Sequence, residues 1–356
     1  MMRIGVVGCG QIARQFHLPS IAQLQQTEVA SLCDTNPVSL KRAAALSPKA
    51  QLFESIDSLI KSKSVDIVDI CTPGFTHFDL AVKCLESGLD VIVEKPVALS
   101  LVETEALDRL CKKSGRDACV MQTLRYHKNV LSMMQLLNRG ALGRPRKVAC
   151  TYHGRNVHNE ASWFHDERKS GGLIYELAIH LLDLTAVLLG RPETVIGFSA
   201  HFAPELEFTT EIAAVVEFEN GRKGIVDLAQ DTTLHSAMFT QMSLYCSGAD
   251  AFLKFGPDYL RVSAGQVDPL QEAVAEFRRL TSFGFEVVTR KYGVHRIEPH
   301  KQIISGFADS IMNGSPIPVT LRSVFNTMRL ADLLSSYIHK KVGTESLERT
   351  LSIPQP

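Results

Sequence analysis

Residues 3–13, with the sequence RIGVVGCGQIA, constrain the fold of this chain more than any other segment. Residues 4–7 are apolar and rich in β-branched side chains, which predicts a strand buried on both faces of a parallel sheet. Small residues at Gly8, Gly10 and Ala13 complete a G-x-G-x-x-A pattern ahead of a predicted helix. A strand, a tight glycine turn and a helix in this order predict the first unit of a doubly wound α/β fold.

The same three small residues predict a dinucleotide-binding turn. Gly8 permits the sharp turn, Gly10 lets a pyrophosphate approach the backbone, and Ala13 allows the helix to pack closely on the strand. We expect Gln11 and Ile12 to contact the cofactor at the start of the helix, where free N–H groups and the helix dipole favour an anion. A turn with a purely structural role is the alternative, because tight turns favour glycine without any ligand.

Asp34 strengthens the dinucleotide interpretation. It ends the next apolar run, residues 28–33, and lies about 20 residues beyond Ala13, which is the usual spacing of the ribose-binding acid. A carboxylate there accepts a hydrogen bond from the 2'-hydroxyl of an adenine ribose and repels a 2'-phosphate. Residues 35–37 include no arginine to bind such a phosphate. The sequence therefore favours NAD over NADP.

Composition and charge narrow the class of protein. The 356 residues leave room for two domains, 45% are hydrophobic, and 38 Lys and Arg balance 38 Asp and Glu. A net charge of zero provides no general field for nucleic acid or an anionic membrane, so neither partner is expected. The eight cysteines show no C-x-x-C spacing and the first residues show no signal-peptide pattern, which is typical of reduced thiols in a cytoplasmic protein.

The hydrophobic pattern divides the chain into two domains. Up to residue 121, strand-length apolar runs alternate with helical segments, which predicts a doubly wound parallel sheet. Beyond residue 125, strand candidates follow one another with short turns such as Asn220-Gly221, which predicts an antiparallel sheet. We place a dinucleotide-binding domain at residues 1–122 and a second domain at residues 123–356. Further strands are predicted at residues 65–70, 90–94, 117–121 and 146–153, and helices at residues 76–87, 100–114 (with a Ser100-x-x-Glu103 capping box), 128–138, 173–189, 269–280, 301–313 and 323–339.

Ligands of doubly wound sheets bind beyond the carboxyl ends of the strands, so residues that follow each strand are candidates for chemistry. After residues 65–70 comes a turn with Thr72 and Pro73, followed by His77. We expect this turn to lie against the dinucleotide. An ordinary Pro-Gly turn is the alternative.

The next strand is followed by Glu94, Lys95 and Pro96, and we expect Glu94 and Lys95 to contact the cofactor. An ammonium at the end of a buried strand needs a partner or a lowered pKa. Pro96 restricts Lys95 to extended geometry, which directs its side chain out of the sheet edge and into the cleft. A solvated lysine at the start of a loop is the alternative.

Three ionisable residues mark the apolar helix predicted at residues 173–189. Glu176, His180 and Asp183 stand at positions i, i+4 and i+7, and hence on one face. Such groups are costly on an apolar helix unless they line a cleft or pair with each other. We expect His180 to act in catalysis together with Lys95, and a histidine satisfied within the core is the alternative.

A metal site is not expected. His153, His158 and His165 lie close together in the sequence, but neither an H-E-x-x-H helix nor a cysteine pair accompanies them. Trp163, the only tryptophan, lies in a polar stretch, where it is either a stacking platform for a sugar or a packing anchor.

The motifs GxGxxA, CTPxxxH, EKP and a late ExxxH helix, taken in this order, resemble the glucose-fructose oxidoreductase, inositol dehydrogenase and rhizopine-catabolism family (Gfo/Idh/MocA) over nearly the whole chain. The resemblance implies an N-terminal Rossmann domain and a C-terminal α+β domain with an open, mostly antiparallel sheet for substrate binding and oligomerisation. It also implies NAD(P)-dependent oxidation of CH–OH groups, or ketone reduction, in sugars and cyclitols, by a homodimer or homotetramer. The lysine of EKP and the histidine of the late helix are catalytic in this family, which implies the same for Lys95 and His180. Glu176 stands where the family has an aspartate.

These residues predict hydride transfer between a substrate carbinol carbon and nicotinamide. His180 is the expected general base, because an imidazole titrates near neutrality, and Lys95 is expected to stabilise the developing alkoxide. Glu176 is expected to bind a neighbouring substrate hydroxyl or to orient His180, with pairing to Arg168 as the alternative. The remaining candidates for substrate contact are Trp163 and, for a carboxylate or phosphate, Arg125, Arg155 and Arg168.

Two other functions stay open at this point. One is a redox-neutral reaction in which bound NAD oxidises a sugar transiently so that a glycosidic bond is cleaved. The other is a non-catalytic dinucleotide sensor that regulates a partner protein. A sensor has no need of Lys95 and His180, so their presence together favours an enzyme.

Overall fold

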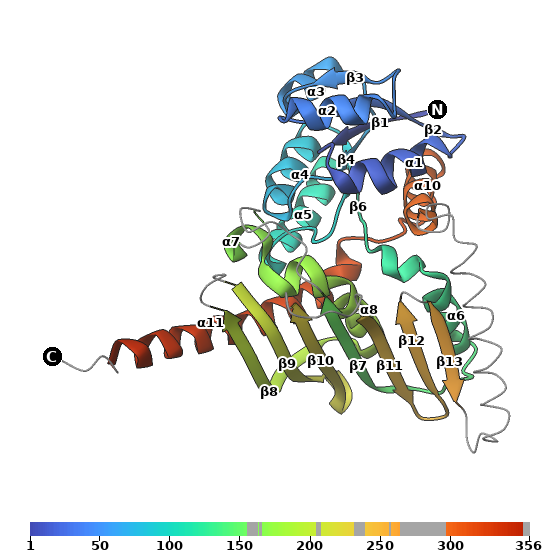
Figure 1. Cartoon of the computed structure of the whole chain (residues 1–356). Helices are drawn as coiled ribbons and strands as arrows, with labels where there is room; N and C mark the ends of the chain where they lie inside the picture. The colour runs from blue at the N-terminus through green and yellow to red at the C-terminus, as the bar shows by residue number, and fades with distance from the viewer. Residues whose placement is uncertain are drawn as a thin grey trace, which may run out of the picture.

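The computed structural model describes residues 1–154, 163, 166–203, 208–230, 239–255, 258–263 and 297–351. Two β-sheets with their helices form the molecule, the N-terminal one drawn above the C-terminal one in Figure 1. The predicted fold class is confirmed: a doubly wound parallel sheet is followed by an α+β unit with an open, mostly antiparallel sheet.

The first sheet is parallel throughout, with the strand order β3-β2-β1-β4-β5-β6. The order changes direction between β1 and β4, and doubly wound folds bind ligands beyond the carboxyl ends of strands at such a point. Every residue of β4 and β5 is buried, as expected for strands covered on both faces. The strands are β1 Met2–Val7, β2 Thr27–Cys33, β3 Gln51–Phe53, β4 Ile67–Ile70, β5 Asp90–Val93 and β6 Ala118–Val120.

A helix lies in each connection between these strands, and capping side chains fix where several of the helices begin. Ser100 Oγ accepts the Glu103 N–H at 3.2 Å and the Glu103 carboxylate accepts the Leu99 N–H at 3.0 Å, so the predicted capping box is confirmed. Asn36 and Ser55 cap two other helices with their side-chain oxygens. The helical elements are η1 Ala13–His17, α1 Leu18–Ala22, α2 Pro37–Ala44, α3 Ile56–Ser62, η2 Gly74–Thr76, α4 His77–Glu86, α5 Leu101–Ser114, η3 Thr123–Tyr126 and α6 Lys128–Asn138.

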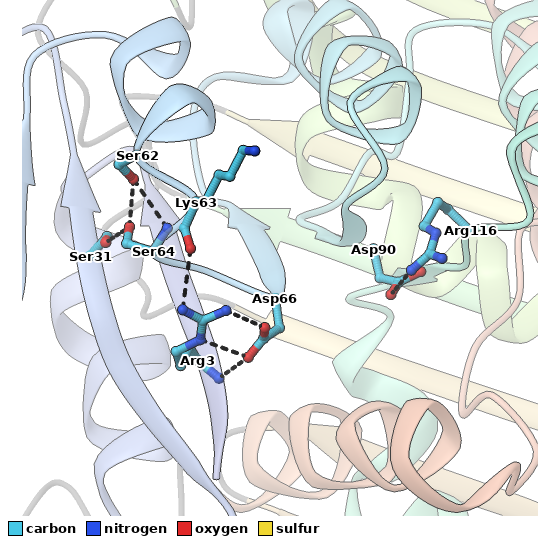
Figure 2. A network of polar contacts seen from close by, with 8 residues as sticks. All are labelled: Arg3, Ser31, Ser62, Lys63, Ser64, Asp66, Asp90 and Arg116. Carbon is cyan, nitrogen blue, oxygen red and sulfur yellow. Dashed lines mark hydrogen bonds and ion pairs between the residues drawn. The ribbon is translucent and has the colours of Figure 1, made fainter.

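Ion pairs tie neighbouring strands at their amino ends. Arg3 donates to the two carboxylate oxygens of Asp66, ahead of β4, at 2.7 and 3.1 Å, and Arg116 donates to Asp90 at 3.4 Å (Figure 2). Both pairs are partly exposed, so each contributes at most about 1 kcal/mol. These ion pairs lie at the amino ends of the strands. The glycine turn lies at the opposite edge of the sheet, at the carboxyl ends.

The second sheet has the order β13-β12-β11-β7-β10-β9-β8, and among its described strands all neighbours pair antiparallel except β7 and β10. Buried and more exposed residues alternate along β7, β9 and β10, because only one face of the sheet is covered. The predicted Asn220-Gly221 turn joins β9 to β10, with φ of 61° and 70° at its two residues. The strands are β7 Pro145–Gly154, β8 Pro192–Ala203, β9 Phe208–Phe218, β10 Arg222–Gln230, β11 Phe239–Cys246, β12 Asp250–Phe255 and β13 Tyr259–Ser263.

The apolar helix predicted at residues 173–189 consists of two elements. A π-helical segment, η5 Leu173–Ala178, comes first, and α8 Ile179–Leu189 follows it and packs against β7 and β10. Gly171 and Gly172 precede η5 with φ of 72° and 67°, a region that favours glycine. Because a π-turn contains more residues than an α-turn, it shifts the direction of Glu176 relative to the residues of α8.

The chain returns to the first sheet near its end. α10 Glu298–Asn313 packs against α1 and η1, which places part of the C-terminal half beside the N-terminal unit (Figure 1). α11 Phe325–Leu351 then packs against α8 and β8. The predicted helices at residues 301–313 and 323–339 are thus confirmed, whereas the one at 269–280 falls outside the described residues. The domain boundary at residue 122 stays a prediction.

All eight cysteines lie within the described residues and are free thiols. Burial raises the pKa of most of them, that of Cys119 to about 12. In the part of the chain that the structure describes, no helix is both long enough and apolar enough to cross a membrane.

Candidate active site

The glycine turn has the geometry that a dinucleotide requires. Gly8 has a φ of 90°, and a Cβ built on it would lie 2.7 Å from the carbonyl carbon of Cys71 and 2.8 Å from the nitrogen of Thr72. No other residue fits this close crossing of β1 and the turn after β4. A Cβ on Gly10 would meet nothing within 4 Å. The backbone there faces open space, which fits the approach of a pyrophosphate.

Asp34 is anchored to the same turn. Its Oδ2 accepts the N–H of Cys9 at 2.7 Å and its Oδ1 accepts the N–H of Asn36 at 2.7 Å. Each oxygen has a second lone pair, so these bonds orient the carboxylate while leaving it able to accept from a ribose hydroxyl. Gln11 and Ile12 are exposed beside this turn, at the start of the helical segment that leads into η1.

The turn after β4 is braced by His77. Its buried ring lies between two backbone carbonyls, with Nε2 2.7 Å from the oxygen of Thr72 and Nδ1 2.7 Å from the oxygen of Pro96. Burial lowers the pKa of His77. Thr72 and Pro73 remain half-buried on the turn itself. His77 thus links the turn to the Lys95-Pro96 segment.

Lys95 and Glu176 meet although 81 residues separate them in the chain. The Lys95 ammonium donates to the backbone carbonyl of Glu176 at 2.8 Å and to its Oε1 at 3.2 Å. The two side chains are 17% and 18% exposed. The lysine that follows β5 is therefore directed toward η5 and held there by one charged and one neutral acceptor. The sequence did not predict this contact. The partners it suggested for Glu176 were His180 and Arg168.

His180 lies on the first turn of α8 and within electrostatic range of Lys95. Burial and the Lys95 charge lower the pKa of His180 to about 3, below the near-neutral value expected for an imidazole. Its Nδ1 is 3.2 Å from the amide oxygen of Gln122. Because that oxygen only accepts, Nδ1 carries the proton and Nε2 is left with a free lone pair.

Arg125 and Asp183 form a buried pair. The guanidinium donates to both oxygens of Asp183 at 2.6 and 2.7 Å and to the side chain and carbonyl of Ser323 at 2.9 Å. Thr327 donates to the same carboxylate at 2.8 Å. These bonds join η3, α8 and the start of α11. The sequence predicts that Arg125 binds a substrate anion, but four of its five N–H donors are used within the protein.

Trp163 lies beside the turn after β4. Its ring centroid is 6.4 Å from that of Phe75, in a tilted arrangement, and Phe75 is 40% exposed. This contact places Trp163 beside the segment that follows the turn after β4. Arg155, His158 and His165 lie outside the described residues, and so does the side chain of Arg168.

The sequence analysis missed three buried side chains behind the site: His17, Asp69 and Gln122. His17 Nδ1 is 2.7 Å from Asp69 and its Nε2 is 2.8 Å from Glu94, and Gln122 contacts His180. Two of them carry a signal in the sequence. Asp69 is a charge inside an apolar strand, and Gln122 follows β6 much as Lys95 follows β5. His17 has no such signal beyond its place on the helix that follows the glycine turn.

A hollow of about 940 Å³ lies at the other end of the second sheet, where β7 and β10 begin. Its lining contains no histidine or carboxylate, and the Lys147 ammonium lies 4.0 Å from the ring centroid of Tyr245. None of the predicted site residues that the structure describes lines it. The cations that line it are Arg144, Arg146, Lys147, Arg222 and Lys223.

A glycine turn with room for a pyrophosphate, next to a lysine and a neutral histidine, is the arrangement of a nicotinamide-dependent oxidoreductase. Comparison with known proteins agrees. Residues 2–122 match the oxidoreductase family with an NAD-binding Rossmann fold, and residues 130–251 match the Gfo/Idh/MocA C-terminal domain. The chain therefore belongs to the Gfo/Idh/MocA family of oxidoreductases, as its motifs predicted.

Three relatives illustrate the similarity. The oxidoreductase YdgJ of Escherichia coli is 25% identical over 346 residues, which are 93% of this chain and 95% of the relative. The scyllo-inositol 2-dehydrogenase (NADP(+)) IolW of Bacillus subtilis is 24% identical over 194 residues, or 54% of this chain and 53% of the relative. The crystal structure of the WlbA dehydrogenase from Bordetella pertussis, in complex with NADH and UDP-GlcNAcA, has a TM-score of 0.78, 19% identity and 96% coverage of both chains.

Proposed function

We propose that this protein transfers a hydride between NAD(H) and a hydroxyl-bearing or keto carbon of a sugar, a sugar derivative or a cyclitol. The observation that carries the proposal is the convergence of Lys95, Glu176 and His180 at the carboxyl ends of β5 and β6. The names of relatives support the substrate class, since one is an inositol dehydrogenase and another binds a nucleotide sugar acid.

NAD, when bound, supplies the carbon that accepts the hydride. His180 takes the hydroxyl proton on Nε2, the nitrogen whose lone pair is free because Nδ1–H donates to Gln122. Its lowered pKa keeps the ring neutral at pH 7, with Nε2 unprotonated, and favours release of the proton after it has been taken up. The Lys95 ammonium donates to the same substrate oxygen and stabilises the alkoxide as the carbinol becomes a carbonyl.

Glu176 has a positioning role in this proposal. Its two oxygen contacts hold the Lys95 ammonium at the site, and a third ammonium hydrogen is available for the substrate oxygen. Trp163 and the arginines Arg155 and Arg168 are proposed to contact the rest of the substrate. We leave Arg125 out of the substrate set, because Asp183 and Ser323 already use its donors.

NAD rather than NADP is the proposed cofactor. The anchored carboxylate of Asp34 presents lone pairs to a 2'-hydroxyl and a negative charge to a 2'-phosphate. One relative is named for NADP(+) and another is bound to NADH. The proposed preference for NAD over NADP therefore rests on Asp34 of this chain.

We also propose that the protein forms a homodimer or homotetramer through the uncovered face of the second sheet. Ile196 on β8 and Ile225 on β10 are 54% and 36% exposed, and apolar residues on an open sheet face favour association. Sedimentation of the purified protein measures the stoichiometry.

Screening tests the proposed function. A panel of sugars, cyclitols and nucleotide sugars is mixed with NAD, and the absorbance of reduced nicotinamide is followed. Accumulation of NADH with one group of related substrates supports a dehydrogenase. Conversion of a glycoside without net NADH identifies the redox-neutral reaction instead, and NAD binding without any turnover across the panel identifies the sensor.

A further inference from the structure

Glu94 is a buried carboxylate directly ahead of the proposed catalytic lysine. It is 8% exposed, and its Oε2 accepts the backbone N–H of Lys95 at 3.0 Å. Its other oxygen, Oε1, lies 2.8 Å from His17 Nε2. A carboxylate in such a place stays charged only if donors replace water. Glu94 has two of them, one on the peptide that carries Lys95 and one on His17.

His17 itself is completely buried and stands between two carboxylates. Its Nδ1 is 2.7 Å from Asp69 Oδ2, and its Nε2 faces Glu94. Ionised carboxylates only accept hydrogen bonds, so both ring nitrogens donate and the ring is an imidazolium. Burial lowers the pKa of His17, but the charges and hydrogen bonds of Asp69 and Cys71 together outweigh burial and raise it well above the usual value. Burial raises the pKa of Glu94, but the hydrogen bond and charge of His17, together with the charges of His300 and Lys95, outweigh burial and lower it to about 2.

The groups around His17 and Glu94 come from four elements. β4 and the turn after it contribute Asp69 and Cys71, whose thiol lies 3.7 Å from Asp69 Oδ1. The end of β5 contributes Glu94, with Lys95 behind it. α10 contributes His300, whose ring meets that of His17 edge-on at 5.3 Å. On α8, the neutral His180 responds to the charges of Glu94, Lys95 and His300.

We propose that His17 is a positioning residue for Lys95 and acts through Glu94. The imidazolium holds Glu94 as a carboxylate, and the carboxylate holds the N–H of the peptide from which the Lys95 side chain extends toward Glu176 and the substrate. His17 belongs to the segment that directly follows the glycine turn, and Asp69 belongs to β4, whose following turn lies against Gly8. One buried chain of charges thus connects the cofactor turn to the proposed catalytic lysine. The inference rests on the proposed role of Lys95.

A divalent cation is the competing occupant of this cluster. Ligand atoms of His17, Glu94 and His300 lie within 4.8 Å of one another, and so do those of His17, Asp69 and Cys71. A metal ligand must offer a lone pair, whereas both nitrogens of His17 are at hydrogen-bond distance from carboxylate oxygens. The imidazolium satisfies the cluster without an ion, and the test below includes metal content.

The test uses His17→Gln and Glu94→Gln, with His127→Gln as a matched control. His127 also pairs with an aspartate, Asp258 at 3.2 Å, but it caps α6 and is not part of the site. With the substrate from the panel, His17→Gln should lower kcat about 10-fold or more, as losses of supporting partners typically do, with a smaller change in KM. Its kcat–pH profile should gain an acid limb at or above pH 4.5, the usual glutamate pKa, because burial then raises the pKa of Glu94. Glu94→Gln should lower kcat without the new limb, and His127→Gln should leave both unchanged.

Nuclear magnetic resonance of the full protein gives a readout that needs no turnover. In protein with ¹⁵N-labelled histidine and lysine, His17 should show two protonated ring nitrogens at neutral pH. The Lys95 ammonium signal should move in His17→Gln and Glu94→Gln but stay in place in His127→Gln. If these shifts occur and no substrate turns over, the positioning role holds and the proposed function fails.

Several results would overturn the inference. Native kcat in both His17→Gln and Glu94→Gln excludes the positioning role, and if His17→Gln does not fold, native kcat in Glu94→Gln alone excludes it. A neutral His17 ring excludes the charge chain. A stoichiometric divalent metal in the purified protein that is lost in Glu94→Gln assigns the cluster to metal binding instead.

Discussion

Replacing Glu176 by glutamine removes one charge and leaves the length of the side chain unchanged. In the native protein the Lys95 ammonium bonds to the Glu176 carbonyl at 2.8 Å and to Oε1 at 3.2 Å. Glu176→Gln keeps the first bond and exchanges the second for a contact with a neutral amide. Because the two side chains are only 17% and 18% exposed, water compensates for the lost charge only in part.

The size of the effect follows from the bond that is lost. A hydrogen bond to a charged group contributes about 1.5–3 kcal/mol. Each 1.4 kcal/mol, approximately, is a factor of ten in rate, so kcat should fall about 10- to 100-fold if this bond holds the ammonium in place at the transition state. The dissociation constant of NAD should change little, since the glycine turn and Asp34 are untouched.

Steady-state kinetics, NAD titration and thermal unfolding of the same samples make up the assay. Glu176→Asp serves as a second variant. It keeps the charge but withdraws it by one carbon–carbon bond, about 1.5 Å, so it should also lower kcat/KM, though less than Glu176→Gln. Native kinetics in both variants together with a lowered Tm would refute the reasoning, because the carboxylate would then only stabilise the fold.

Three further predictions concern the cofactor turn and pH. Asp34→Ala should raise the affinity for NADP relative to NAD, and an unchanged ratio in competitive titration would remove Asp34 from the selection of cofactor. Gly8→Ala should lower Tm, because its Cβ would lie 2.7 Å from the Cys71 carbonyl carbon, whereas Gly10→Ala should keep Tm and weaken NAD binding; equal Tm values for both variants would contradict this difference. The pKa of His180 is about 3 in the folded chain against 6.5 unfolded, so the unfolded chain takes up the proton first and stability declines as pH falls from 6.5 toward 3. His180→Gln should therefore lose less Tm than the native protein over that interval, and parallel Tm curves would argue against the lowered pKa.

The geometry of the glycine turn could be predicted because it is local, while its contacts with a cofactor stay a prediction. A strand, a turn and a helix of fixed dimensions place Gly8 and Gly10 beyond the carboxyl end of β1, and the next strand brings Asp34 to the same edge, where it accepts the N–H of Cys9. The structure adds physical reasons for two of these residues, the crowded Cβ position of Gly8 and the open one of Gly10. Capping of α5 by Ser100 is equally local and was predicted for the same reason.

Pairings between distant segments could not be predicted. Lys95 meets Glu176 across 81 residues and Arg125 meets Asp183 across 58, and both contacts depend on how η5 and α8 pack against the ends of β5 and β6. A uniform helical period gives no sign of the π-helical turn at Glu176. The lowered pKa of His180 has a similar origin, since burial and the approach of Lys95 are tertiary properties.

The rate of NADH formation by the variants Lys95→Met and His180→Ala tests the central claim most directly. With the substrate that the panel identifies, each variant should lower kcat by about 100-fold or more, because general acid-base assistance typically contributes that much, while NAD still binds with native affinity. The double variant should lose less than the product of the two single losses, since each group needs the other to act on the same oxygen. NADH formation at the native rate in either single variant, with NAD binding intact, would contradict the assignment of Lys95 and His180 as the catalytic pair.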